Sequence, residues 1–165
     1  MAGNVINVTA GSQAILTLGT TAPMAIPDAD EASHGMRVAT VQDITVNSSP
    51  GIVRYSVLDD SASQAFTTVN ENSVSLNILL NDDQFFGNAS LTDNAIETNG
   101  LFLTQNNKTE IFFSVAFDGT DSGANYVYGT GFLSGLAPSA SLDQAIWISS
   151  LEIAVNGELA KDVLA

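Results

Sequence analysis

The chain is poor in the residues on which most enzymes and metal sites depend. It has no cysteine, a single histidine (His34), a single tryptophan (Trp147) and only four Lys plus Arg among its 165 residues. The absence of cysteine excludes disulfide bonds, thiolate metal ligands and a thiol nucleophile. Its apolar runs are far shorter than the about 20 residues that a membrane-spanning helix needs. We therefore expect neither a disulfide-stapled fold nor a membrane protein.

Basic residues are also too few to hold a polyanion. Eighteen Asp and Glu against four Lys and Arg give a formal net charge of −14. A nucleic-acid-binding surface needs clustered Lys and Arg that displace counterions from phosphates. Such an acidic balance either keeps the protein soluble or marks a surface that must repel a polyanion, and composition alone leaves both interpretations open.

Patterns typical of catalysis or metal binding are sparse. His34 lies in a polar loop, and one histidine does not supply the two or three fixed ligands that a metal needs. No Gly-x-Ser-x-Gly elbow and no glycine-rich phosphate loop occurs. The stretch DGTDSG (118–123) lacks the distal glutamate of a calcium loop and lies between two expected strands, which favours a hairpin turn. We expect no enzyme activity, no metal and no cofactor.

Short alternating segments make up most of the chain and predict a mainly β fold. Branched and aromatic residues alternate with polar ones between clusters of Gly, Asn, Asp and Ser. This spacing is typical of a two-sheet β-sandwich or barrel-like domain. The expected strands are 12–18, 36–46, 51–59, 72–80, 109–118, 125–136 and 144–157.

Two segments depart from the β pattern. The stretch ASLTDNAIETNG (89–100) has a cap residue at Thr92, an acid at Asp93 and a stop at Gly100, which predicts one short helix. The last residues, ELAKDVLA, predict a frayed helical tail. The start, MAGNVINVTAG, has no basic residue and no long apolar core, so we expect no secretory signal there.

We expect one domain over 1–165. It would consist of an N-terminal strand and extended loop (1–35), a β-sandwich core (36–158) and a C-terminal tail (159–165). Alternation assigns a set of side chains to the interior between the sheets: Phe113, Val115, Phe117, Trp147, Leu151 and Ile153.

The order of several weak motifs resembles that of the major tail tube proteins of tailed bacteriophages, which are related in fold to type VI secretion tube proteins. A V-x-D-I-T segment (41–45) is followed by a strand that runs into YSVLDDSASQAF, and then by a return strand that ends in an aspartate-rich turn, NENSVSLNILLNDD. The second half has an aromatic strand ending near GFLSGL, a P-x-A-x-x-D turn and a last strand closing on VNG. The resemblance covers roughly residues 36–158.

This resemblance implies a structural virion protein. Subunits of the family join edge to edge into hexameric rings that stack into a tube, and double-stranded DNA passes through the tube during ejection without specific binding. Expected partners are further copies of the chain and the tape measure, baseplate or tail tip, and tail terminator proteins, with no membrane. The expected location is the virion tail, and the host cytoplasm during assembly.

The resemblance also suggests roles for particular residues. The loop 59–71 would bridge stacked rings, with Asp59, Asp60 and Phe66 as its candidate contacts. Phe66 would be the apolar anchor against the next ring. The candidates for the DNA-facing surface are Arg54, Ser73, Ser75, Asn77, Ser150, Glu152 and Asn156. Arg54 is the one cation among them, and we expect a carboxylate such as Glu152 to neutralise it.

Other interpretations of the same β pattern remain open. The chain could be another virion β-sandwich, such as a head decoration or tail terminator protein. It could also be a carbohydrate-binding or adhesin-like module. Such a module usually presents exposed aromatic side chains, whereas the alternation places Trp147 on the apolar face of its strand.

Overall fold

The computed structural model describes residues 14–20, 36–38, 41–56, 62–80, 82–90, 95–117, 119, 123–141 and 144–163. These residues form mainly β-strands, as the alternation predicts. The strands are β1 (Ile15–Gly19), β2 (Met36–Val38), β3 (Val41–Ser49), β4 (Ile52–Tyr55), β5 (Gln64–Thr67), β6 (Glu71–Leu79), β7 (Glu110–Ala116), β8 (Asn125–Ser141), β9 (Gln144–Val155) and β10 (Ala160–Val163). The helices are α2 (Asp82–Phe86) and α3 (Ala95–Asn106).

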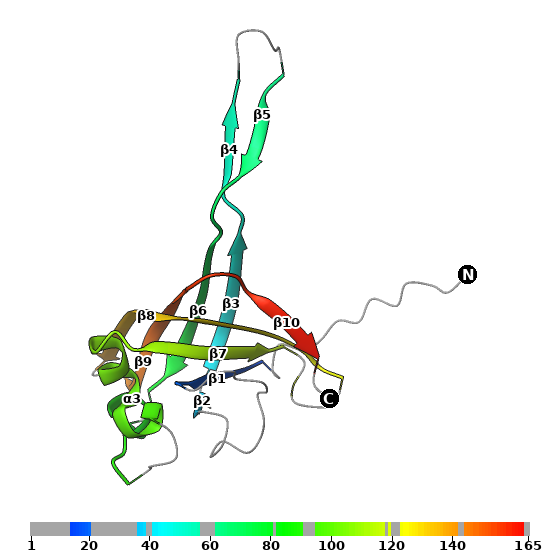
Figure 1. The fold of residues 1–165 in the computed structure, drawn as a ribbon. Coiled ribbons are helices and arrows are strands. Elements are labelled where there is room, and N and C mark those ends of the chain that lie inside the picture. The colour runs from blue at the N-terminus through cyan, green and yellow to red at the C-terminus, as the bar shows by residue number, and fades with distance from the viewer. Residues whose placement is uncertain are drawn as a thin grey trace.

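Eight of these strands join one antiparallel sheet in the order β2-β1-β7-β8-β9-β6-β3, with β10 paired to β8. The long strand β8 belongs to both halves of this sheet. Its first part, from Tyr126 to Phe132, pairs with β7, and the part from Gly131 onward pairs with β9. The sheet therefore folds over at β8 into two layers, and β1 and β7 run across β3 and β6 in Figure 1. This is the sandwich-like arrangement that the sequence predicts.

The core lies between the two layers, and α3 covers one end of it. Because side chains alternate between the faces of a strand, every second residue of β1, β6, β7 and β9 points inward. Inward-facing residues of both layers and the helices are buried: Leu16, Leu18, Met36, Val38, Val74, Leu76, Ile78, Phe85, Ile96, Leu101, Ile111, Phe113, Val115, Leu133, Leu151 and Ile153.

Four of the six expected core residues are confirmed and two are wrong. Phe113, Val115, Leu151 and Ile153 are fully buried, whereas 39% of Phe117 and 49% of Trp147 is exposed. Phe117 follows the last pair of the β1–β7 ladder, and Trp147 precedes the last pair of the β6–β9 ladder. Both side chains therefore lie past the edge of the layer that would have covered them.

The expected strand 36–46 is two strands in the structure. β2 pairs with β1 at one end of the sheet order, and β3 pairs with β6 at the other. Most of the hairpin turn expected at 118–123 lies outside the described residues, and the strands β7 and β8 on either side of it pair antiparallel.

The single helix expected at 89–100 begins later and extends further. Gly100, expected as its end, only interrupts α3, with φ of 73° and ψ of 168°, and the chain is helical again after it. The expected cap at Thr92 and Asp93 lies outside the described residues. Sequence reasoning also missed α2, which has only five residues.

The C-terminal segment is a strand rather than the expected helical tail. β10 pairs antiparallel with β8, with Asp162 opposite Tyr126. Burial of Tyr126, and to a lesser degree the negative charge of Asp162, raises the pKa of its phenol. Ladder hydrogen bonds to β8 replace those that a helical turn would have made, so local propensity is overridden by pairing.

The corrected core predicts a large loss of stability for one aromatic truncation and a small loss for another. Phe113→Ala should lower the free energy of unfolding by about 3–5 kcal/mol, because it opens a cavity between the layers. Trp147→Ala should lower it by about 1 kcal/mol or less, as is usual at partly exposed positions. Urea denaturation of both variants tests this, and a larger loss for Trp147→Ala than for Phe113→Ala would contradict the core as described.

Candidate functional surfaces

One broad polar surface lies on the side of β6 and β9 that faces away from the core. In β6, buried Val74 and Leu76 alternate with Ser73, Ser75 and Asn77, which point outward. The register with β9 sets Ser75 opposite Glu152 and Asn77 opposite Ser150. The structure thus brings together five of the side chains that the sequence assigned to a DNA-facing surface.

The same polar surface continues onto the two flanking strands, which sequence reasoning missed. On β3, Asp43, Thr45 and Asn47 lie opposite Asn77, Ser75 and Ser73. On β8, Gly135 and Ala137 lie opposite Glu152 and Ser150. The alternation of Asp43, Thr45 and Asn47 with Ile44 and Val46 was a usable signal, because it gives β3 one polar and one apolar face. We call this four-strand surface (β3, β6, β9 and the second part of β8) the polar face.

Hydrogen bonds fix the side chains of the polar face in place. The Asn77 amide Nδ2 donates to both carboxylate oxygens of Asp43, at 3.1 and 2.9 Å. The Asn47 Nδ2 donates to Ser73 Oγ at 3.3 Å. A shallow hollow of about 260 Å³ lies at the centre of this surface, between Asp43 and Glu152. The polar face therefore consists of small polar side chains together with the acids Asp43 and Glu152.

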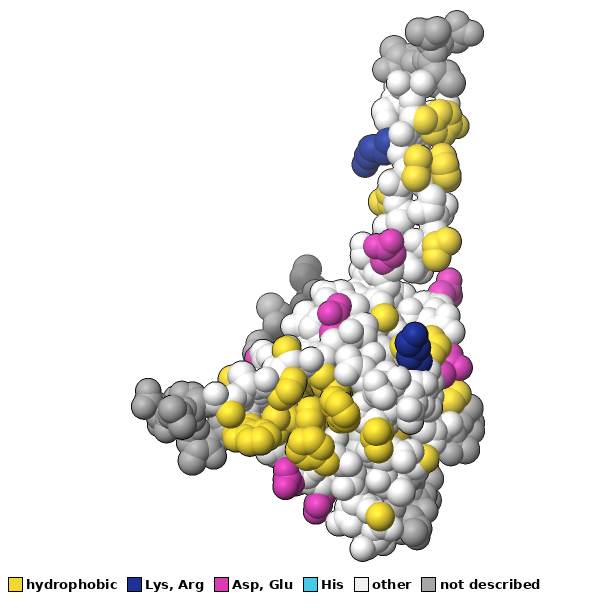
Figure 2. All heavy atoms as spheres, turned by 90° about the vertical axis from the view of Figure 1, so that its left-hand side faces the viewer, with side chains coloured by type: hydrophobic (Ala, Val, Ile, Leu, Met, Phe, Trp, Pro, Cys, Tyr) yellow, Lys and Arg dark blue, Asp and Glu magenta, His cyan; other side chains and the backbone are white. Residues whose placement is uncertain are grey.

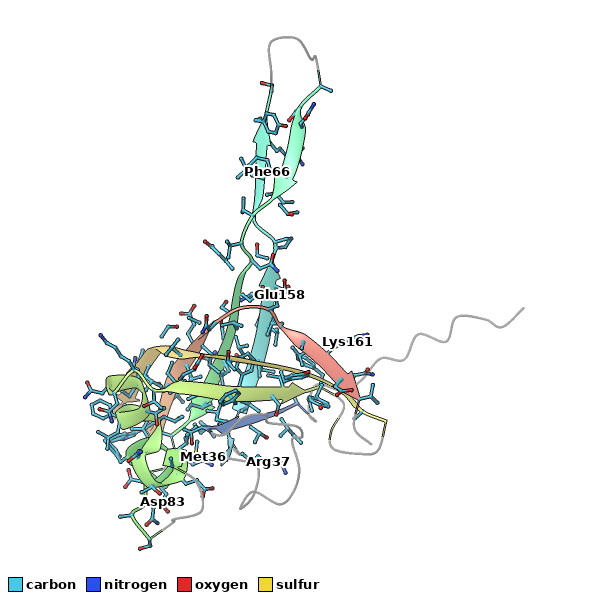
Figure 3. The ribbon with its side chains drawn as sticks, in the orientation of Figure 1. Met36, Arg37, Phe66, Asp83, Glu158 and Lys161 are labelled. Atoms are coloured by element: carbon cyan, nitrogen blue, oxygen red, sulfur yellow. The ribbon has the colours of Figure 1, made fainter. Side chains whose placement is uncertain are left out.

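No Lys or Arg among the described residues lies on the polar face. The segments of β3, β6, β8 and β9 contain neither Lys nor Arg. The four basic residues lie on β2 (Arg37), on β4 (Arg54), in the turn after α3 (Lys108) and on β10 (Lys161). Figure 3 shows Lys161 on β10, to one side of β3 and β6. The surface thus lacks the groups that hold phosphates.

Two of the expected members of this surface lie elsewhere. Arg54 was expected on the same sheet, which is wrong: its strand β4 pairs only with β5 in a separate two-stranded sheet, where Arg54 lies opposite Ala65. Asn156 follows the end of β9, and its Nδ2 donates to Glu110 Oε1 of β7 at 3.0 Å. Glu152 is therefore not positioned to neutralise Arg54.

The second candidate surface is a long hairpin that projects from the body. β3 and β6 lead into β4 and β5, which extend away from the eight-stranded sheet (Figure 1). One face of the hairpin is apolar: Val53 lies opposite Phe66, and Tyr55 opposite Gln64. The rings of Tyr55 and Phe66 are 5.9 Å apart, and Tyr55 donates its hydroxyl hydrogen to Gln64 Oε1 at 2.8 Å. We call Val53, Tyr55 and Phe66 the hairpin face.

The hairpin face is open to solvent in a single copy. Between 42% and 51% of each of its three side chains is exposed. Figure 3 shows Phe66 on the hairpin, far from the body. An isolated two-stranded hairpin is only marginally stable in water, and exposed aromatic side chains are typical of a contact surface. Asp59 and Asp60, which the sequence also assigned to this loop, lie outside the described residues.

The neck of the hairpin depends on a glycine. The Thr68 amide donates to the Gly51 carbonyl at 2.7 Å, which holds the two strands together where they leave the body. A Cβ on Gly51 would come within 2.1 Å of Thr68 Oγ1 and 2.6 Å of the Val69 carbonyl oxygen. The second contact is with backbone, so a side chain here would have to displace the neck itself.

No other described feature points to chemistry. Among the described residues, no three His, Asp or Glu side chains gather closely enough to hold a metal ion. His34 lies outside them. The helices that are described are too short or too polar to cross a membrane.

Comparison with solved structures identifies the fold. The tail of an empty gene transfer agent particle, with C6 symmetry, matches with a TM-score of 0.62 and 13% identity over 93% of this chain and 98% of that chain. The SPP1 tail tube matches with a TM-score of 0.64 and 13% identity over 94% and 80%. A structure of the anti-feeding prophage baseplate, 6-fold symmetrised, matches with a TM-score of 0.55 and 7% identity over 98% and 97%.

At these identities the likeness concerns the fold alone. The chain has the tail tube protein fold, and the resemblance noted from the sequence is confirmed at that level. No protein-family model and no curated protein matches the sequence.

The neck geometry predicts the effect of a single methyl group. Gly51→Ala should make the local opening that exposes the Thr68 amide to hydrogen exchange easier by about 1–3 kcal/mol, because the added carbon overpacks the neck. Amides of the β6–β9 ladder should be unaffected. Gly135→Ala is a matched control, since its Cβ would meet Glu152 Cβ at an ordinary 3.5 Å. Unchanged hydrogen exchange at Thr68 in the Gly51→Ala protein would contradict this role of Gly51.

Proposed function

We propose that this chain is the structural subunit of a virion tail tube, built as stacked hexameric rings whose channel lets double-stranded DNA pass. The observation that carries the proposal is the polar face. It is a continuous four-strand surface with acids and small polar side chains and without Lys or Arg, in a chain that has the tail tube fold. The chain acts as a scaffold in this role, and its residues are not called on for catalysis.

Two open strand edges supply a way to form the ring. Among the described strands, β3 pairs only with β6, and the part of β8 beyond Phe132 pairs only with β9. Each copy thus presents a four-stranded sheet with a free edge on both sides. Free edges expose unpaired N–H and C=O groups, and pairing with the next copy satisfies them. Closure of a ring by identical contacts removes every such edge.

The size of the resulting channel supports this role. The gene transfer agent tail has C6 symmetry, and six copies of a four-stranded sheet give 6 × 4 = 24 strands. With strands about 4.8 Å apart and tilted by about 40°, the barrel has a circumference of about 150 Å and a diameter of about 48 Å between backbones. A DNA duplex fits inside this barrel with a layer of water.

The charge of the polar face suits the passage of DNA. Six copies carry a formal charge of 6 × −14 = −84 per ring, of which Asp43 and Glu152 contribute 6 × −2 = −12 on the polar face. Each Lys or Arg in contact with a phosphate would add counterion-release affinity and slow sliding. Acidic and small polar groups instead repel the duplex and keep it hydrated.

The hairpin serves the stacking of rings in this proposal. Its apolar face has no cover in a single copy, and contact with a copy in the adjoining ring would bury it. The same tube would meet the tape measure, baseplate or tail tip, and terminator proteins at its inside and its two ends. Assembly would take place in the host cytoplasm, and the finished tube would belong to the virion.

Electron microscopy of the purified full-length chain tests the proposal directly. Long tubes built from six-fold rings are the expected result. Removal of residues 53–66 should leave the body folded, because the hairpin pairs only with itself, and should abolish long tubes. Phe66→Ala should act in the same direction more weakly, and Val163→Ala, an exposed apolar position on β10, is the matched control. Discrete monomers of the intact chain, or long tubes without the hairpin, would contradict it.

A charge placed on the polar face tests the DNA channel. Ser75→Lys adds six cations to each ring at the channel wall, so assembled tubes should retain a short labelled duplex at low salt and release it as salt rises. Wild-type tubes should retain none. Asn106→Lys, at the exposed end of α3, changes the net charge equally and should retain far less. Equal retention by both variants would show that the polar face does not line the channel.

A further inference from the structure

A second exposed apolar surface lies on the helices. The rings of Phe86 and Phe102 are 6.5 Å apart, and both contact the buried ring of Phe85, at 4.9 and 6.1 Å. About half of Phe86 and Phe102, and 40% of Leu103, is exposed. We call Phe86, Phe102 and Leu103 the aromatic patch. Figure 2, which views the molecule from the α3 side, shows apolar side chains gathered on the body there.

The aromatic patch is held by a close backbone contact between α2 and α3. A Cβ on Gly87 would come within 2.4 Å of the Thr98 carbonyl oxygen, and one on Gly100 within 2.3 Å of the Gly87 nitrogen. Both glycines have positive φ, 85° and 73°. The Asn88 amide also donates to the Glu97 carbonyl at 2.9 Å. The two helices are therefore locked together, and their aromatic side chains form a preorganised surface, which lowers the entropic cost of binding.

Charged residues of both signs surround the two apolar surfaces. The helices α2 and α3 contain Asp82, Asp83 and Glu97, and Lys108 lies in the turn directly after α3. The strand β4 contains Arg54, and the sequence between β4 and β5 contains Asp59 and Asp60. Figure 2 shows acidic and basic side chains beside the apolar patch on the body. Apolar contact therefore has to supply the pairing of the two surfaces.

We infer that the aromatic patch is the receptor for the hairpin face of a second copy of this chain, in the adjoining ring. This inference rests on the proposed tube. The two surfaces lie at different ends of the molecule: in Figure 3, Phe66 is high on the hairpin and Asp83 of α2 is at the far side of the body. A contact between two different surfaces of one chain is heterologous, and repeating it produces an open-ended stack.

The chemistry of the two surfaces suits this pairing. Tyr55 and Phe66 on the hairpin meet Phe86 and Phe102 on the helices. Aromatic pairs in offset or edge-to-face contact contribute more binding free energy than the burial of their apolar area alone. Aromatic side chains that desolvate one another at the centre, with charges at the rim, are the usual anatomy of a specific interface.

Disulfide trapping between copies tests the receptor assignment. No native cysteine can compete for the introduced thiols, because the chain has no cysteine of its own. Phe66→Cys and Phe102→Cys proteins are mixed, assembled and oxidised. Because a disulfide forms only where two Cα atoms approach within about 7 Å, this mixture should give about tenfold more covalent dimer than a mixture of Phe66→Cys with Val163→Cys. Tyr55→Cys replaces Phe66→Cys if the latter builds no tubes.

The outcomes separate this inference from the proposed function. Tubes that form without a dimer of the hairpin and patch cysteines would overturn the receptor assignment and leave the tube intact. Failure of the wild-type chain to form any tube would contradict the proposed function itself. If the mixture of Phe66→Cys with Val163→Cys gave as much dimer as the mixture of Phe66→Cys with Phe102→Cys, the assignment would also be overturned. The hairpin would then contact the body without selectivity.

Discussion

The register between β6 and β9 is the constraint on which the rest of the structure depends. Val74 pairs with Ile153 and Leu76 with Leu151, so both pairs enter the core together. The same register places Ser75 beside Glu152 on the outside. A slip of one residue would bury the acid and expose the apolar pairs, so core packing and the polar surface specify each other. In the proposed tube, the channel lining is thus set by the free energy that builds the core.

The hairpin face and the aromatic patch are exposed apolar surfaces that the proposed assembly would bury. Soluble monomers rarely leave aromatic clusters open to water, yet about half of Phe66, Phe86 and Phe102 is exposed. Among the described residues, the hairpin joins the body at the neck, where the Gly51 carbonyl accepts a hydrogen bond from the Thr68 amide. In the proposed tube, a neighbouring copy covers the hairpin face, and this burial favours the addition of that copy.

Sequence alternation was sufficient to predict the β class, most of the strands and the part of the polar face that lies on β6 and β9. Ser73, Ser75 and Asn77 could be assigned to one side because a strand repeats every two residues. Alternation could not place Trp147, because it does not reveal where a neighbouring strand stops. It likewise assigned Arg54 to the main sheet, since only pairing partners distinguish a protruding hairpin from a body strand. The strand β10 shows the same limit: its helical composition is overridden by pairing with β8.

A cryo-EM map of tubes assembled from the purified chain tests the central claim most directly. The account predicts six-fold rings in which β3, β6, β9 and the second part of β8 form the inner wall, with Asp43, Ser75 and Glu152 facing the channel. No Lys or Arg side chain should reach that wall. A channel lined instead by Arg37, Lys161 or the apolar core residues of β6 and β9 would contradict the account.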